Sequence, residues 1–100
     1  MTDLKSIFTQ LNIPFAYARF KKPVNPPYAV YMGAGQDTFG ADNTWYHRQN
    51  RYQLEYYFEL KNEENEAAIE SALLNNGYNY TKSEDVFIDD EGVFVIYYTI

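Results

Sequence analysis

The feature that most constrains the fold is a strict alternation of apolar and polar side chains in the middle of the chain. Within residues 45–60, the last ten positions place five apolar residues on one side of an extended backbone: Tyr52, Leu54, Tyr56, Phe58 and Leu60. Successive side chains of a strand point to opposite faces, so this pattern predicts a half-buried β-strand. Tyr57 is the exception, because it puts an aromatic ring on the otherwise polar face. Such a strand needs neighbours on its edges and a layer over its apolar face.

Two amphipathic helices are predicted to supply that layer. Thr2 and Asp3 favour a helix start, Asn12 and Pro14 favour its end, and apolar residues recur between them at helical spacing: Leu4, Ile7, Phe8 and Leu11.

The second helix is predicted to begin after the capping residue Asn62 and to end at Gly77. Its first turn is acidic, which suits the helix dipole, and contains Glu63, Glu64 and Glu66. Its expected apolar stripe contains Ala68, Ile69, Ala72 and Leu73.

The remaining segments are predicted to be strands, loops and turns. Further strands are expected over residues 15–20, 28–32 (resuming through 39), 78–88 and 93–100. Three prolines make residues 21–27 a loop, and Asp and Asn at 41–43 favour a turn, so residues 28–40 and 44–60 should form a hairpin. A bend or bulge fits residues 33–40. The alternation places Trp45 and His47 on the polar face with Arg51, and a bulge at residues 48–50 would move them to the opposite face. Residues 89–92 are expected to form a turn.

The expected architecture is a single α+β domain over residues 1–100. It has a mainly antiparallel sheet of about four to five strands, two helices packed on one face, and the order α-β-β-β-α-β-β. The last strand is apolar on both sides, so the second face keeps apolar side chains that a partner subunit would bury: Tyr31, Tyr57, Val95 and Tyr97.

Composition excludes several classes of function. The absence of cysteine excludes a disulfide scaffold, a thiol nucleophile and a Cys-ligated metal site. Neither a secretory signal nor a membrane-spanning run of apolar residues is present, which favours a soluble protein made in the cytoplasm. The net charge of −6 argues against nucleic acid as a partner.

The charge is unevenly distributed along the chain. Residues 1–52 contain six Lys and Arg against three Asp, whereas residues 53–100 contain two Lys against eleven Asp and Glu. This polarity fits a protein whose basic side meets the acidic side of a neighbouring copy, although exposed charges also simply solvate a surface.

No combination of residues indicates catalysis, a metal or a cofactor. His47 is the only histidine, and Asp42, five positions away, is its only candidate partner for an enzyme. The acidic residues 85–91 do not match a calcium loop, and the glycines at 33 and 35 have neither the helix nor the Lys of a phosphate loop. Base stacking by the tyrosines near Lys21, Lys22, Arg48 and Arg51 is disfavoured by the overall acidity.

Several motifs resemble small proteins encoded in the tail-morphogenesis regions of siphophages and prophages of Gram-positive bacteria. The similar segments are PPYAVY at 26–31, FGADN at 39–43, Tyr46, Asn50, LEYY at 54–57 and YTKSE at 80–84, and they span nearly the whole chain. The tip at residues 90–92 departs from the pattern. The family resembled is that of tail-terminator or head–tail joining (tail completion) proteins.

This resemblance implies an α+β subunit of a ring, commonly a hexamer, that caps the tail tube and presents a surface to the head connector. Subunit contacts are then expected from the 28–60 hairpin and the last strand, through Tyr31, Arg48, Arg51, Tyr57, Val95 and Tyr97. Contacts with neighbouring tail or head proteins are expected from loops 21–27 and 33–40, through Lys21, Lys22, Gln36 and Asp37. The alternative is a monomeric acidic module that binds a host protein.

Overall fold

The computed structural model describes residues 4–41 and 45–100, and for residues 36–41 and 45–50 it describes the backbone alone. The helices and strands are α1 (Leu4–Gln10), β1 (Phe15–Tyr17), β2 (Tyr28–Ala41), β3 (Trp45–Phe58), α2 (Glu63–Asn75), β4 (Thr81–Lys82), β5 (Val86–Ile88) and β6 (Val93–Thr99).

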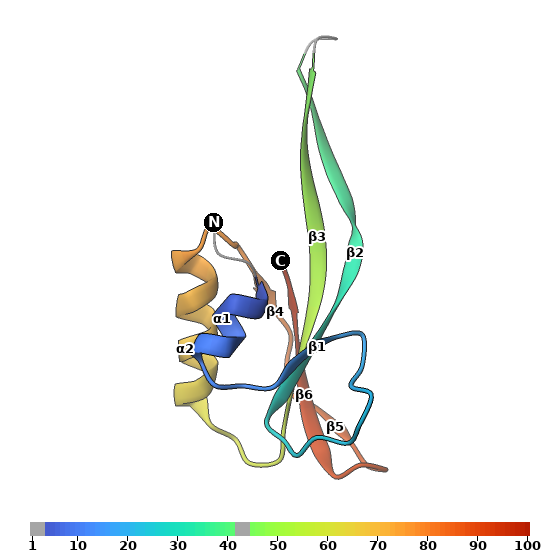
Figure 1. Cartoon of the computed structure of the whole chain (residues 1–100), viewed down its shortest axis with the longest axis vertical. Helices are drawn as coiled ribbons and strands as arrows, with labels where there is room; N and C mark the ends of the chain where they lie inside the picture. Colours follow the sequence, from blue (N-terminus) through green and yellow to red (C-terminus); the bar gives the residue numbers. More distant parts are fainter. Residues whose placement is uncertain (1–3, 42–44) are drawn as a thin grey trace.

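The strands of the described chain form one sheet of six strands in the order β1-β2-β3-β6-β4, with β5 also paired to β6. All pairs are antiparallel except β1 with β2. Both helices lie on one face of the sheet (Figure 1). The expected α+β class, the mainly antiparallel sheet and the order of helices and strands are therefore confirmed, and the sheet has six strands rather than four to five because the segment before β6 is divided in two.

The alternation in β3 builds the core as predicted as far as Phe58, whereas Leu60, expected on the same face, lies beyond the strand and is 84% exposed. Leu54, Tyr56 and Phe58 are buried on the helical face, together with Ile96 and Tyr98 of β6. The helices cover them with five buried residues, which are Leu4, Ile7, Phe8, Ile69 and Leu73. Each large apolar side chain contributes about 1.5–3 kcal/mol on burial, so this shared cluster is the main stabilising feature of the fold.

The helix ends follow local chemistry. The side chain of Asn62 accepts a hydrogen bond of 3.1 Å from the amide of Asn65, which confirms the predicted cap of α2. Gly77 follows α2 with a φ of 86°, and Asn12 follows α1 with a φ of 61°. Both residue types tolerate this left-handed conformation, which ends a helix. The predicted starter residues of α1, Thr2 and Asp3, lie outside the described residues.

The predicted hairpin is present as β2 and β3, each 14 residues long. The register shift lies in β2, because Gly33 pairs with Tyr52 whereas Gln36 pairs with Asn50. Gly35 in this bulge has a φ of 100°, a conformation that favours glycine. The described pairing of β3 is continuous through residues 48–50, so the bulge considered there does not occur. Most of the predicted turn at 41–43 lies outside the described residues.

The prediction of a single strand over residues 78–88 is wrong, because the structure has two short strands there, β4 and β5. Lys82 pairs with Tyr98 and Val86 pairs with Val95, so the segment between β4 and β5 contains one residue more than the facing part of β6. Ser83 accounts for the break: its hydroxyl oxygen accepts a 2.9 Å hydrogen bond from the amide of Tyr97, in place of a backbone partner. Such a side-chain bond competes with the regular ladder.

The second face differs from expectation at two residues. Tyr31 pairs with Leu54 and stacks on Phe15 at 4.7 Å, which places it on the helical face rather than the second face. Val95 lies on the second face but is 0% exposed within one chain, so it is not left uncovered for a partner. Its cross-strand neighbours on either side are Tyr57 of β3 and Val86 of β5.

Candidate functional site

The most prominent surface feature is the part of the β2–β3 hairpin beyond the Gly33–Tyr52 pair, which we call the arm (residues 34–51). It projects far from the helices and from the other strands (Figure 1). The molecule consequently measures 51 × 26 × 26 Å and has a radius of gyration of 15.1 Å, against about 13 Å for a compact chain of this length.

The arm is a ribbon of two strands. In the described part of the chain, β1 pairs with β2 only at residues 29–31, and the contacts of β6 with β3 end at Tyr52. Beyond these points the outer edge of each strand carries backbone groups without a third strand. Two-stranded ribbons are marginally stable in water and are ready templates for further pairing. The arm is therefore suited to contact another chain.

Four residues expected at contact sites lie on the arm. The register pairs Gln36 with Asn50, Asp37 with Gln49, and Arg48 with Thr38. Their side chains lie outside the described part of the structure. Arg51 is half-buried at the base of the arm. The backbone therefore brings the two groups of expected contact residues, which the sequence analysis assigned to different partners, onto one structural unit.

A groove of about 550 Å³ lies on the second face, between the β1–β2 loop and the sheet. Its floor contains Tyr28 and Tyr57, which are paired in register and stack at 4.9 Å. Phe20, from the loop, meets Tyr28 edge to face at 5.4 Å and holds the loop against the sheet. The two wall residues Val24 and Val30 are apolar. The floor thus offers a partly exposed aromatic surface.

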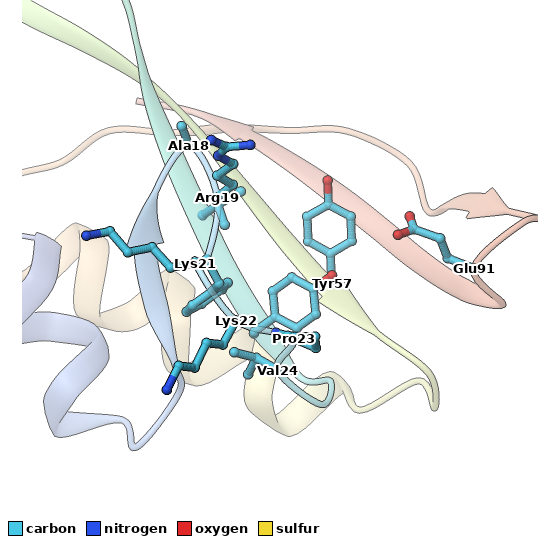
Figure 2. A pocket seen from close by; sticks show the side chains of 11 residues that line it. Ala18, Arg19, Lys21, Lys22, Pro23, Val24, Tyr57 and Glu91 are labelled. Carbon is cyan, nitrogen blue, oxygen red and sulfur yellow. The ribbon is translucent and has the colours of Figure 1, made fainter.

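The two sides of the groove have opposite charge. Lys21 and Lys22 extend from the loop, away from Tyr57, whereas Glu91 lies on the other side of the tyrosine (Figure 2). Burial, followed by the nearby Glu91 carboxylate, raises the pKa of Tyr28. Burial, with a 2.6 Å hydrogen bond donated to Glu55, also raises the pKa of Tyr57. Both phenols therefore stay neutral at physiological pH and present aromatic faces rather than charge.

The structure brings some of the expected contact residues together and separates others. Tyr57, Lys21 and Lys22 line the same groove. Tyr97 is half-buried on the same face and pairs with Glu55, next to the groove floor. Tyr31 and Val95 do not join this surface, as described above. The sequence did not predict the groove. Phe20 and Val24, two apolar residues of the β1–β2 loop, were nevertheless a signal that this loop packs on the sheet.

A second charged cluster lies on the helical face. Glu66 is only 2% exposed and forms ion pairs of 2.9 Å with Lys61 and 3.0 Å with Lys82. Lys82 also contacts Glu70 at 2.8 Å, and Glu70 accepts a hydrogen bond from Tyr98. The hydrogen bond to Glu70 is the main cause of the raised pKa of Lys82. These contacts tie α2 to the edge strand β4.

From the sequence, Glu66 was predicted only as a residue of the acidic first turn of the helix. Its position also predicts that it faces the sheet, because Glu66 lies three residues before Ile69 and seven before Leu73, on the apolar stripe of the helix. Burial of that carboxylate follows from this spacing, and its lysine partners are supplied by segments that only the fold brings close.

The described part of the chain offers no metal-binding arrangement, and the candidate pair of Asp42 and the His47 side chain lies outside it. Within these residues, no three His, Cys, Asp or Glu side chains are grouped as metal ligands. Neither described helix has the length and apolarity required to cross a membrane. The carboxylates of the helical-face cluster are paired with lysines, an arrangement that stabilises the fold. The arm and the groove remain as the candidate functional surfaces.

Comparison with models of known families, with curated proteins and with solved structures finds no match. The function is therefore inferred from the geometry and charge of the arm and the groove, together with the resemblance noted in the sequence.

Proposed function

We propose that this protein is a non-enzymatic structural subunit of a phage or prophage tail. It forms a homo-oligomeric ring, commonly a hexamer, that ends the tail tube and joins it to the head connector. The protein is made in the host cytoplasm and becomes part of the tail or neck of the virion.

The arm carries this proposal. Outside the body of the subunit it has two strands, two open edges and no covering layer in the described residues. An isolated ribbon of this kind gains little stability alone, and it gains hydrogen bonds and packing when a neighbouring chain lies against it. A subunit that repeats such a head-to-tail contact forms a ring when the rotation between neighbouring copies closes.

The second face supports the same function. Its aromatic floor of Tyr28 and Tyr57 is only half-buried in one chain. Tyr is favoured at protein interfaces, because its ring is large and rigid and its hydroxyl remains hydrated. A ring subunit has two neighbours, and the arm and the second face offer it two distinct surfaces.

A monomeric acidic module that binds a host protein is the second candidate. It is favoured by exposed carboxylates for which the described residues supply no ion pair, including Glu59, Glu84, Asp89 and Asp90. A basic host protein would complement such a surface.

Removal of the arm tests the ring. Because Gly33 and Tyr52 are directly paired, residues 34–51 are replaced by Asn-Gly, a two-residue turn that joins paired strand residues. The full chain and the shortened chain are compared by native mass spectrometry and by electron microscopy, each with and without the tail-tube protein. The full chain should form closed rings, and the shortened chain should remain a folded monomer.

Circular dichroism of the shortened chain checks that the body keeps its fold. The proposal fails when the full chain stays monomeric even with the tail-tube protein. It also fails when the folded, shortened chain forms the same rings. Capture of one basic host protein by a monomeric full chain, weakened by salt, would instead support the acidic module.

A further inference from the structure

The β1–β2 loop carries a group of three exposed cations. Arg19, Lys21 and Lys22 are exposed and border the groove. Within the described residues, none of the three has an ion pair. Lys61 and Lys82, by contrast, are both paired with carboxylates. The loop therefore presents positive charge that is available for an external partner.

The outer face of α2 has the opposite character. Glu63 and Glu64 are exposed in its first turn and have no ion pair among the described residues. Helical spacing continues this face through small and apolar exposed residues, which are Ala67, Ala68, Ser71 and Leu74. Ala68 was expected in the buried stripe, yet the structure exposes it. Leu74, at the far end, is 54% exposed. The helix thus presents an acidic start followed by a flat, weakly apolar surface.

These two surfaces lie on opposite sides of the subunit. α2 covers one face of the sheet, and the β1–β2 loop lies on the other (Figure 1). They cannot meet within one chain. Two complementary surfaces on opposite sides of a subunit are what a head-to-tail contact between identical copies requires.

We propose that the outer face of α2 docks on the groove of the next copy, with Glu63 and Glu64 facing Lys21 and Lys22. The flat surface around Ala67 and Ser71 then lies over the aromatic floor of Tyr28 and Tyr57. Glu91, on the opposite side of the groove, repels a carboxylate and directs the acidic start of α2 to the lysine side (Figure 2). This inference rests on the proposed ring and adds, to the contact made by the arm, a second contact between neighbouring subunits.

Position in the fold favours α2 over the acidic turn at residues 89–91. Asp89 and Asp90 lie in the turn that includes Glu91, which borders the groove itself. This turn therefore lies on the same face of the sheet as the lysines, across the groove from them. A head-to-tail contact joins opposite sides of two copies. It can therefore bring α2 to the lysines of the next copy, but not the turn.

Charge exchange tests the contact. The variant K21E/K22E and the variant E63K/E64K should each associate about tenfold more weakly than the natural chain, because exposed ion pairs of modest strength are replaced by repulsion. The combined four-residue variant restores opposite charges and should recover association. Sedimentation velocity measures the association, and circular dichroism confirms that each variant is folded.

The matched control is D89K/D90K, which makes the same change of charge at the turn and should associate like the natural chain. A second measurement uses the absence of cysteine: a K22C/E64C chain should form disulfide-linked ladders on oxidation, because the proposed contact brings position 22 of one copy beside position 64 of the next. Within one subunit the β1–β2 loop and α2 lie on opposite sides of the sheet, so the two thiols cannot join inside one chain.

The outcomes are distinguishable from failure of the proposed ring. Rings that form equally well in both charge-reversed variants, or a folded four-residue variant that does not recover, would overturn this contact while the ring survives. Loss of association in D89K/D90K alone would assign the acidic partner to the turn. Absence of any association or ladder in the natural chain and the cysteine variant would overturn both.

Discussion

The hydroxyl group of Tyr98 donates a hydrogen bond of 2.8 Å to Oε2 of Glu70, joining β6 to α2 across 28 positions of sequence. Tyr98 is fully buried, and burial together with the Glu70 carboxylate raises the pKa of its phenol. The contact holds the acidic helix in one position over the sheet. We expect it to contribute measurably to the stability of the subunit.

Replacement of Tyr98 by Phe removes that hydroxyl and keeps the ring. The variant should lose about 1–2 kcal/mol of unfolding free energy, because a hydrogen bond to a charged acceptor is lost inside the core. Urea denaturation measures the difference. The control Tyr97→Phe changes a half-buried tyrosine of the same strand and should have a smaller effect.

The acid stability of the protein should depend on Glu70. Burial acts to raise the pKa of its carboxyl, but hydrogen bonds from Lys82 and Tyr98 outweigh this effect and hold the pKa below its ordinary value of 4.5. A lowered pKa in the folded state gives stability that is complete above 4.5 and is lost as the pH falls through the folded pKa. The free energy of unfolding should therefore fall more steeply below pH 4.5 in the natural chain than in Glu70→Gln.

The ion pair between Lys82 and Glu70 also loses its contribution to stability at high pH. The pKa of Lys82 is raised above 10.5, so its contribution is present below that pH and is lost only as the pH rises through the raised value. A natural chain whose stability has the same pH dependence as Glu70→Gln would contradict both statements.

Buried Glu66 should matter more than its exposed neighbour. Glu66→Gln keeps the shape of the side chain but removes the charge that pairs with Lys61 and Lys82. We expect a loss of about 1–2 kcal/mol in unfolding free energy, since both lysines are partly exposed and regain hydration. Glu64→Gln, on the outer face of the same turn, should change it by less than about 0.5 kcal/mol. Equal effects of the two substitutions in thermal unfolding would refute the role of burial.

The end of α2 depends on Gly77. Its φ of 86° lies in the left-handed region, where a Cβ atom is strained. Gly77→Ala should therefore destabilise the protein by about 1 kcal/mol, seen as a lower melting temperature. Gly77→Asn should cost less, because asparagine tolerates this region better than alanine does. The reverse ranking of the two variants would argue against backbone strain as the cause.

Local pattern predicted the fold where one segment determines its own environment. The period of two in β3 identified its buried face, and the period of the helices identified Ile7, Phe8, Ile69 and Leu73 as core residues. The cap at Asn62 and the terminator at Gly77 were also read directly, because caps depend on neighbouring backbone groups alone.

Prediction failed where two segments must be placed relative to each other. Tyr31 lies on a strand with apolar residues on both sides, so only the register with Leu54 decides its face. Ser83 interrupts a strand through a bond to Tyr97, a residue 14 positions away. The groove likewise requires the loop at Phe20 to lie over Tyr28 and Tyr57. None of these relations is encoded in the periodicity of a single segment.

The pairing of Gly33 with Tyr52 forms a seam between two parts of the molecule that evolve under different demands. On one side of this seam, the strands supply buried core residues, and substitutions of those residues are costly. On the other side, the described strands β2 and β3 pair only with each other. A lineage can therefore lengthen, shorten or exchange this ribbon without rebuilding the subunit. Divergence among related chains should concentrate there, following the changing neighbours that the ribbon meets.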